Sequence, residues 1–305
     1  MKSAVVVPTL NALPVWGDCI NALVATGVNA GDVYIYDSGS VDGTVMQAEN
    51  AGFNVRHVAQ GTFDHGGTRQ MAVDELEGYE FIVFLTQDAI LSCSDALQVI
   101  LRPFEDRQVA AVCGKQLPRK NSGHIEAHAR LYNYPAESSI NELGNRSVKG
   151  LKVAFMSNSF AAYRTSSLGE IGGFPNNVIF GEDMFVAAKM LLSGYKVAYE
   201  AEASVYHSHG YSLWQETRRY FDMGVFHANE SWIRRELGGA EGEGMKFVIA
   251  EFRYLLKYAP WRVPEGVLRT LLRYTGFRLG LAEKSLPLSL KKFLAMNKVY
   301  FERKY

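Results

Sequence analysis

The chain has 305 residues, of which 48% are hydrophobic and 21% charged, a composition that excludes a disordered protein and suits a folded domain with a sizeable core. Its three cysteines lie far apart without a C-x-x-C pair, which argues against a disulfide framework or a zinc site. No apolar stretch reaches the ~18 residues of a membrane span, so we expect a cytoplasmic protein, soluble or peripheral to a membrane.

The net charge of zero conceals an asymmetry along the chain. Residues 246–305 contain 13 Lys and Arg against 4 Asp and Glu, whereas residues 1–245 contain 19 against 28. This distribution predicts an acidic body with a basic tail that contacts something anionic. Nucleic acid and anionic lipid both fit the charge.

The first 115 residues alternate between short apolar runs and segments with helical spacing. We expect strands at residues 3–7, 33–36, 54–58, 81–85 and 109–113. We expect helices at residues 15–25 and 42–50, and from about residues 68 and 94. This alternation indicates an α/β fold with a parallel sheet covered on both faces. Such folds bind ligands at the carboxyl ends of strands, here residues 8–11, 37–44 and 86–89.

The second half begins with a stretch of weak periodicity. Glycines and prolines interrupt residues 116–149, and we expect a mobile functional segment there. Regular structure resumes at residues 153–163, with a helix at 182–192, a strand at 196–199 and helices after His209. We therefore expect one domain of residues 1–235, divided at residue 115, and a basic helical extension of residues 236–305.

The turn at residues 37–44 contains two carboxylates and two serines directly after a predicted strand. Asp42 suits the N-cap of the next helix, and a capped turn explains one carboxylate. The capped turn does not explain the second carboxylate. Asp37 is therefore a candidate to accept a hydrogen bond from the base or ribose of a nucleotide.

Asp88 follows the wholly apolar run at residues 81–85. It can cap the next helix, or it can bind a divalent cation that bridges to diphosphate oxygens. Gln87 precedes it. Two histidines, His207 and His209, follow a later strand two positions apart and can either bind a metal or lie satisfied in the core.

Glu182 and Asp183 open a predicted helix. The helix dipole favours acids at this position, which is a structural explanation. A carboxylate beside another carboxylate also has a raised pKa, which suits a general base. Both explanations stay open at this point.

Residues 63–69 combine glycines, a threonine and Arg69 at a predicted helix start, with His65 among them. This composition fits either an anion-binding helix entry or an ordinary capped turn. The chain contains no G-x-G-x-x-G after a strand, no P-loop and no G-x-S-x-G elbow. Their absence argues against a dinucleotide-dependent dehydrogenase, a P-loop ATPase and an α/β-hydrolase.

The ordered motifs Val6-Val-Pro-Thr-Leu-Asn11, Asp37-Ser-Gly-Ser-x-Asp42, Gln87-Asp88, Gly181-Glu-Asp183 and Val205-Tyr-His207 resemble those of inverting family 2 glycosyltransferases. The resemblance covers about residues 3–230. It implies a GT-A fold, a Rossmann-like and mostly parallel sheet flanked by helices, with a C-terminal helical extension. Residues 63–70 are similar to the bacterial rhamnosyltransferase branch, although Gln70 replaces its usual Asn.

The resemblance implies a role for each matching residue. Residues 1–115 bind the nucleotide sugar, and residues 116–235 carry the acceptor and catalytic part. Asp183 corresponds to the catalytic base. Asp88 corresponds to the last acid of the D-x-D motif and binds Mg²⁺ or Mn²⁺ with His207, or with its neighbour His209. The donor-binding residues are Pro8, Thr9, Asn11, Asp37, Asp42, His65, Arg69 and Gln87.

The family also implies partners. The donor is dTDP-L-rhamnose, or alternatively a UDP- or GDP-linked sugar, and the acceptor is a saccharide or lipid-linked saccharide of a bacterial surface polysaccharide. No nucleic acid is expected. A helix at residues 264–280 places leucines on one side and arginines on another, so it either lies on an anionic membrane at the cytoplasmic face of the inner membrane or packs on the domain with a solvated charged face. A sugar nucleotidyltransferase and a lectin-like module are the competing classes.

Overall fold

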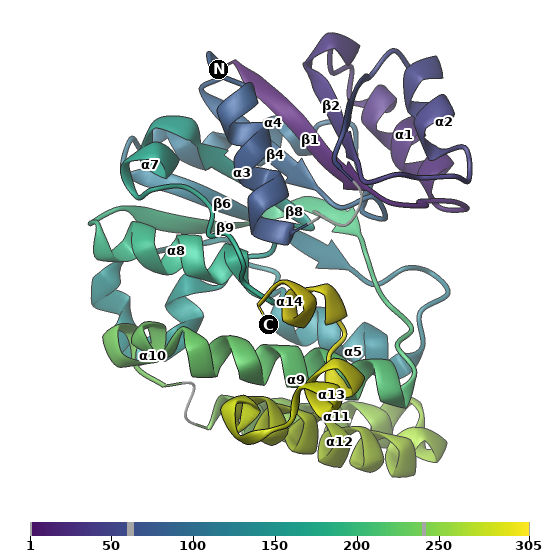
Figure 1. The fold of residues 1–305 in the computed structure, drawn as a ribbon, viewed down its shortest axis with the longest axis vertical. Coiled ribbons are helices and arrows are strands. Elements are labelled where there is room, and N and C mark those ends of the chain that lie inside the picture. The colour runs from purple at the N-terminus through teal and green to yellow at the C-terminus, as the bar shows by residue number, and fades with distance from the viewer. Residues whose placement is uncertain (1, 60–63, 240–241, 305) are drawn as a thin grey trace.

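A computed structural model describes residues 2–59, 64–239 and 242–304 of the chain (Figure 1). A single sheet lies at its centre, in the order β3-β2-β1-β4-β8-β6-β9-β5, with β7 paired to β9. The strands are β1 (Ser3–Thr9), β2 (Val33–Asp37), β3 (Asn54–His57), β4 (Phe81–Leu85), β5 (Ile90–Leu91), β6 (Val109–Leu117), β7 (Ser139–Asn141), β8 (Phe160–Arg164) and β9 (Lys196–Tyr206).

The first four strands of this order and the β6–β9 pair are parallel, which confirms the expected Rossmann-like half. The sheet is mostly parallel, as expected, and β8 departs from this direction because it inserts between β4 and β6 and runs antiparallel to both. Alternation of apolar residues reports that a strand is buried, but it contains no information on strand direction.

Successive residues of β1 enter different hydrophobic cores on the two faces of the sheet. Ala4 and Val6 pack in one core, while Val5 and Val7 pack in the other. Helices α1 (Trp16–Ala25), α2 (Thr44–Asn50) and α4 (Ala96–Val99) contribute to the second core. Helices α3 (His65–Glu75), α7 (Thr165–Glu170) and α8 (Glu182–Leu192) contribute to the first.

The segment from residue 116 to 149 is more regular than its sequence indicates. Strand β6 extends to Leu117, and helix α5 (His124–Asn133) follows. Gly123 precedes α5 and Pro135 follows it, so the predicted breakers act as its boundaries. Shorter helices complete the fold: η1 (Ala30–Asp32), η2 (Arg102–Glu105), η3 (Leu143–Asn145), α6 (Arg146–Lys149) and η4 (Gly150–Ala154).

The C-terminal part is helical, as expected. It comprises α9 (Leu213–Asn229), α10 (Ser231–Leu237), α11 (Glu243–Tyr258), η5 (Pro260–Arg262), α12 (Val263–Leu281), η6 (Glu283–Ser285), α13 (Leu288–Leu294) and α14 (Lys298–Lys304). Figure 1 shows α9, α11 and α12 as a layer beside the sheet. Among the described residues, no helix combines the length and apolar character required to cross a bilayer. The division of the chain at residue 235 stays a prediction.

Helices α9 and α12 touch through their backbones. A side chain at Gly276 or Gly280 would overlap the carbonyl oxygen of Thr217 or Phe221, and Gly224 meets α12 from the other side. Only glycine allows so close an approach. The basic extension is therefore packed tightly against the rest of the molecule.

Two arginines of α12 point inward. Arg273 bonds to Glu216 of α9 at 2.7 Å and to Glu251 of α11 at 3.1 Å, and Arg269 bonds to Glu216 at 2.6 Å. A solvated charged face on a packed helix was one of the two expectations, and it fails for these two arginines because the carboxylates draw their guanidinium groups into the helix layer. Instead, α11, η5 and α12 present an apolar face to solvent, made of Met245, Ile249, Phe252, Leu256, Trp261, Val267, Leu268, Leu271 and Tyr274.

Candidate active site

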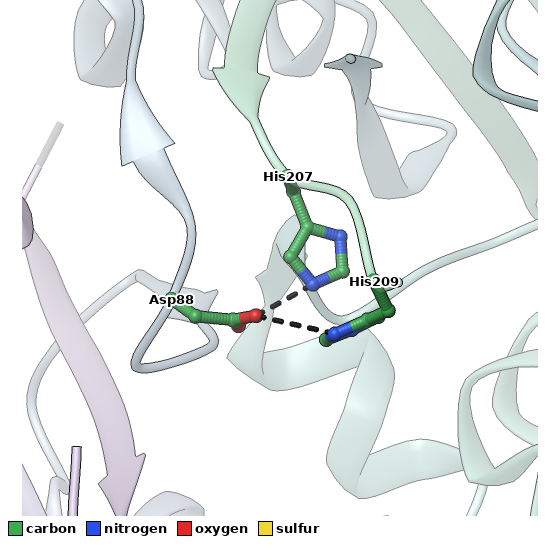
Figure 2. A group of neighbouring side chains, drawn as sticks. All are labelled: Asp88, His207 and His209. Carbon is green, nitrogen blue, oxygen red and sulfur yellow. Dashed lines mark ion pairs between the residues drawn. The ribbon is translucent and has the colours of Figure 1, made fainter. Parts of the chain in front are cut away.

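Asp88, His207 and His209 form a carboxylate–histidine cluster beyond the ends of β4 and β9 (Figure 2). The pairing of β5 with β9 aligns Ile90 with Tyr206 and so brings the two loops together. Asp88 Oδ1 lies 3.3 Å from His207 Nε2, and Oδ2 lies 3.6 Å from His209 Nδ1. The structure thus brings together the residues expected to bind a metal.

The side chain of Gln116 fixes the orientation of the His207 ring. The amide nitrogen of Gln116 donates to Ser157 Oγ at 2.8 Å, so its oxygen faces His207 Nδ1 at 2.9 Å and accepts from it. In this tautomer Nε2 bears a lone pair. That atom is buried and has no hydrogen-bond donor among the described residues. An unprotonated imidazole nitrogen facing a carboxylate fits a divalent cation between them.

The protonation states of the cluster also suit a metal. Burial lowers the pKa of His207 and, with the neighbouring His207 ring, lowers that of His209 to about 3. A neutral imidazole and an ionised carboxylate are the forms that coordinate Mn²⁺ or Mg²⁺.

The residues expected to bind the nucleotide gather in one hydrogen-bonded loop system at the ends of β1, β2 and β4. Pro8 and Thr9 end β1, whose register places Thr9 beside Asp37. Gln87 holds the backbone of Leu10 through both its amide oxygen, at 2.7 Å, and its amide nitrogen, at 3.2 Å. Asn11 accepts from the Val41 amide at 2.9 Å. The sequence motifs are therefore neighbours in space.

The two carboxylates of this loop system have internal partners. Asp37 accepts from Thr9 Oγ1 and Ser40 Oγ with one oxygen, and from the amides of Gly39 and Ser40 with the other. Although burial opposes it, these bonds lower the pKa of Asp37. Asp42 accepts from the Thr44 hydroxyl and the Leu13 amide. Both residues therefore shape the loops that surround the predicted nucleotide pocket.

Asp183 lies in the first turn of α8, where its oxygens accept from the amides of Met184 at 2.7 Å and Asn158 at 3.3 Å. Burial and the adjacent Glu182 carboxylate raise its pKa to about 7. A carboxyl group with a pKa close to neutral is suited to accept a proton. The raised pKa is compatible with the role of base that the family resemblance implies, and that role stays a prediction.

Arg69 is placed differently from the diphosphate contact expected of it. The side chain is 4% exposed, and its Nη1 lies 3.0 Å from Glu182 Oε1 and donates to the carbonyl of His65 at 2.8 Å. His65 itself is exposed at the start of α3. Of the motif that contains them, Phe63 lies outside the described residues. The Arg69 guanidinium therefore forms an ion pair with Glu182 in this structure.

Two arginines near the cluster were not identified from the sequence. Arg119 Nη2 donates to the Asp88 carbonyl at 2.5 Å and lies 3.6 Å from its carboxylate. Arg130 Nε donates to the His207 carbonyl at 2.9 Å. Both belong to the segment in which periodicity fails, so no motif marked them. They add positive charge where a diphosphate would meet the metal.

A cavity of about 1010 Å³ extends from Asp183 and His209 into the helix layer. Its walls come from α5, α9, α11 and α12, and we call it the helix-lined cavity. Its volume lies at the upper end of the range that is usual for ligand pockets. The proposed base therefore faces a space that a substrate can enter.

Residues 2–221 match the model of a protein family described as glycosyltransferase-like family 2. The fold agrees with this match, and the chain belongs to that family and is a glycosyltransferase. It is 44% identical over 302 residues to the O-antigen chain rhamnosyltransferase RfbN of Salmonella typhimurium, covering 99% of this chain and 96% of the relative. It is 46% identical over 297 residues to the O-antigen chain rhamnosyltransferase WbaN of Salmonella anatum, with 97% and 94% covered.

Solved structures of low identity share the fold. Mannosyltransferase PcManGT from Pyrobaculum calidifontis, in complex with GDP-Man and Mn²⁺, superimposes with a TM-score of 0.56 at 19% identity, covering 99% of this chain and 86% of that one. TarS 1–349 of S. aureus in complex with UDP-GlcNAc gives a TM-score of 0.59 at 16% identity, with 98% and 85% covered. These matches identify the GT-A fold expected from the sequence.

Proposed function

We propose that this protein transfers L-rhamnose from dTDP-L-rhamnose to a saccharide acceptor during the synthesis of bacterial O-antigen. The observation that carries the sugar assignment is the identity of 44–46% to two O-antigen chain rhamnosyltransferases over almost the whole chain. The geometry supports the chemistry, because the candidate base Asp183 lines the same cavity as His209 of the candidate metal cluster.

The reaction is a single displacement. Asp183 takes the proton from an acceptor hydroxyl while that oxygen forms a bond to the anomeric carbon, and the bond from that carbon to the diphosphate oxygen breaks. Attack on one side and departure from the other invert the anomeric configuration. dTDP leaves with the electron pair of the broken bond.

Asp88 and His207 would hold the divalent ion, with His209 as the neighbouring ligand. When bound, Mn²⁺ or Mg²⁺ neutralises charge on the departing diphosphate. Arg119 would add a further positive charge on the same side. Gln87, Thr9 and Asn11 would keep the loops around the nucleotide in place, as their hydrogen bonds indicate.

We further propose that the acceptor is lipid-linked and that the enzyme works at the cytoplasmic face of the inner membrane. The apolar face of α11, η5 and α12 supports this placement, because so many large apolar side chains exposed on neighbouring helices suit contact with a membrane. Arg253 and Lys257 are exposed among its residues. The nearby carboxylates Glu251 and Glu265 are engaged with Arg273 and Arg269, so cations prevail where anionic headgroups would lie.

A donor panel tests the sugar assignment. The purified enzyme is incubated with dTDP-L-rhamnose, UDP-glucose, UDP-GlcNAc or GDP-mannose and with Mn²⁺ or Mg²⁺, and release of the nucleotide diphosphate is followed. We expect metal-dependent release from dTDP-L-rhamnose at the highest kcat/KM. Faster turnover of a UDP- or GDP-linked sugar would overturn the rhamnosyl assignment and leave the glycosyltransferase class standing.

A further inference from the structure

The helix-lined cavity has a composition that the donor does not explain. Asp183 and His209 lie at its catalytic end, and the remainder extends away from the nucleotide loops between α5, α9, α11 and α12. Pockets for small ligands are lined by apolar and aromatic side chains with a few polar groups that fix orientation. The deeper part of this cavity has that character.

Aromatic rings dominate the deeper wall. Phe247 of α11 and Tyr132 of α5 pack edge to face, with centroids 5.1 Å apart. Both are partly exposed and both line the cavity. The C–H groups on the apolar side of a pyranose carry partial positive charge, which packs favourably on the negative face of an aromatic ring. Arg273 lies over the Phe247 ring at 5.6 Å and Lys152 over the Tyr132 ring at 5.3 Å, so a sugar would stack on the remaining face of each ring.

One guanidinium of the cavity lies over aromatic rings and has no carboxylate partner among the described residues. Arg269 and Arg273 are paired with glutamates, whereas Arg219 of α9 lies over the rings of Phe180 and Tyr211 at 5.0 and 5.7 Å. Within the described residues Arg219 has no carboxylate within 4 Å. Its guanidinium can donate to sugar hydroxyls between the aromatic wall and Asp183.

The cavity also reaches the apolar face. Met245, Leu271 and Tyr274 line the cavity and at the same time belong to that exposed surface. A ligand that enters from this side passes the aromatic wall before it reaches Asp183.

Resting on the proposed function, we propose that the helix-lined cavity is the binding site of the acceptor saccharide. The sugar that receives rhamnose lies at Asp183 and Arg219, and a preceding sugar stacks on Phe247 and Tyr132. The rest of the acceptor leaves toward the apolar face. The C-terminal helices thus determine which acceptor is used, while the sheet determines the donor.

The test uses Phe247→Leu and Tyr132→Leu, which keep apolar volume but remove the ring face. Phe247→Tyr is the conservative variant. Phe293→Leu is the matched control, because Phe293 of α13 is exposed and lies outside both the cavity and the apolar face. Acceptor is supplied as membranes of the source strain from which the gene has been deleted, and dTDP-[¹⁴C]rhamnose is the donor. Thermal unfolding and dTDP affinity of every variant report whether it is folded.

We expect both leucine variants to raise the half-saturating amount of membranes by about tenfold, since a lost aromatic contact of ~1.4 kcal/mol corresponds to that factor. Donor hydrolysis without membranes should be unchanged in both leucine variants, and the Phe247→Tyr variant and the Phe293→Leu control should match the wild type in transfer to membranes. Unchanged half-saturation in both leucine variants would overturn this inference alone. Failure of the wild type to transfer rhamnose to these membranes would overturn the proposed function, and the acceptor site with it.

Discussion

Arg69 and Glu182 form a buried ion pair beside Asp183, with 3.0 Å between Nη1 and Oε1. The Asn158 side chain donates to the same Glu182 oxygen at 3.0 Å and accepts from Tyr163 at 2.7 Å. This network lowers the pKa of Glu182 against the opposing effect of its burial. An ionised Glu182 is the charge that helps to raise the pKa of its neighbour Asp183.

Replacement of the base tests its role directly. Asp183→Asn keeps the shape of the side chain but cannot take the acceptor proton, so we expect transfer to fall by about 10²–10⁴-fold. The affinity for dTDP, measured by calorimetry, should stay within a factor of about two, since the residue faces the cavity rather than the nucleotide loops. Wild-type transfer rates in this variant would exclude Asp183 as the base.

The pH dependence follows from the raised pKa of Asp183. Because only the ionised carboxylate accepts a proton, kcat/KM should rise with pH and level off above about 7. Glu182→Gln removes the neighbouring negative charge and leaves Arg69 unpaired, and both changes lower the pKa of Asp183. The acid limb of the pH–rate profile should therefore move to lower pH, whereas the exposed control Glu77→Gln should leave it in place. An unchanged or raised limb would contradict the coupling.

Gln116 should matter to metal binding without touching the metal. Its oxygen fixes the tautomer and orientation of His207, so Gln116→Leu should weaken Mn²⁺ binding by about 10–100-fold. His207→Ala and Asp88→Ala should weaken it at least as much, and EDTA should abolish wild-type turnover. Calorimetric titration of Mn²⁺ into enzyme with dTDP measures these changes. Equal affinity in Gln116→Leu and in the exposed control Gln98→Leu would show that the His207 ring is positioned by other contacts.

The inward arginines make the helix layer sensitive to single changes. Arg273→Leu leaves Glu251, whose side chain is 3% exposed, without its partner, and should lower the free energy of unfolding by about 3–5 kcal/mol. Adding Glu251→Gln should restore part of that loss, because the buried charge is then gone. Urea unfolding measures both, with Arg278→Leu on the exposed side of α12 as the control. A loss no larger than that of the control would show that the pair contributes little.

The apolar face should bind anionic membranes. Phe252→Glu and Leu256→Glu place a charge on its centre and should reduce flotation with phosphatidylglycerol liposomes by at least about tenfold. Val148→Glu, at a fully exposed position elsewhere, should float like the wild type. Flotation should also weaken as salt is added, since the flanking cations are screened. Equal flotation of all variants would remove this face as the contact.

The N-terminal half of the fold was predictable because each of its strands is a short apolar run followed by polar turn residues. The run at 81–85 is completely buried, and Asp88 follows it as expected. The antiparallel insertion of β8 was not predictable, because its neighbours β4 and β6 are fixed by pairing across long stretches of chain. Local patterns contain no such information.

The same reasoning explains which site residues were found. Asp88, Asp183 and His207 stand at the ends of regular elements, where a motif is visible. Gln116 acts on His207 only through the pairing of β6 with β9. The arginines of α12 turned inward because glutamates of two other helices meet them, a pairing that the helical pattern of one segment cannot reveal.

The glycine contact between α9 and α12 has a consequence for how acceptor preference diverges among relatives. Helix α12 cannot be exchanged alone, since any helix that replaces it must also have glycines at the positions of Gly276 and Gly280 to pack against the backbone of α9. Chimeras that graft α9 to α12 as one block should import the acceptor choice of their source together with a matched interface. The enzyme is then modular in function although it is not modular in packing.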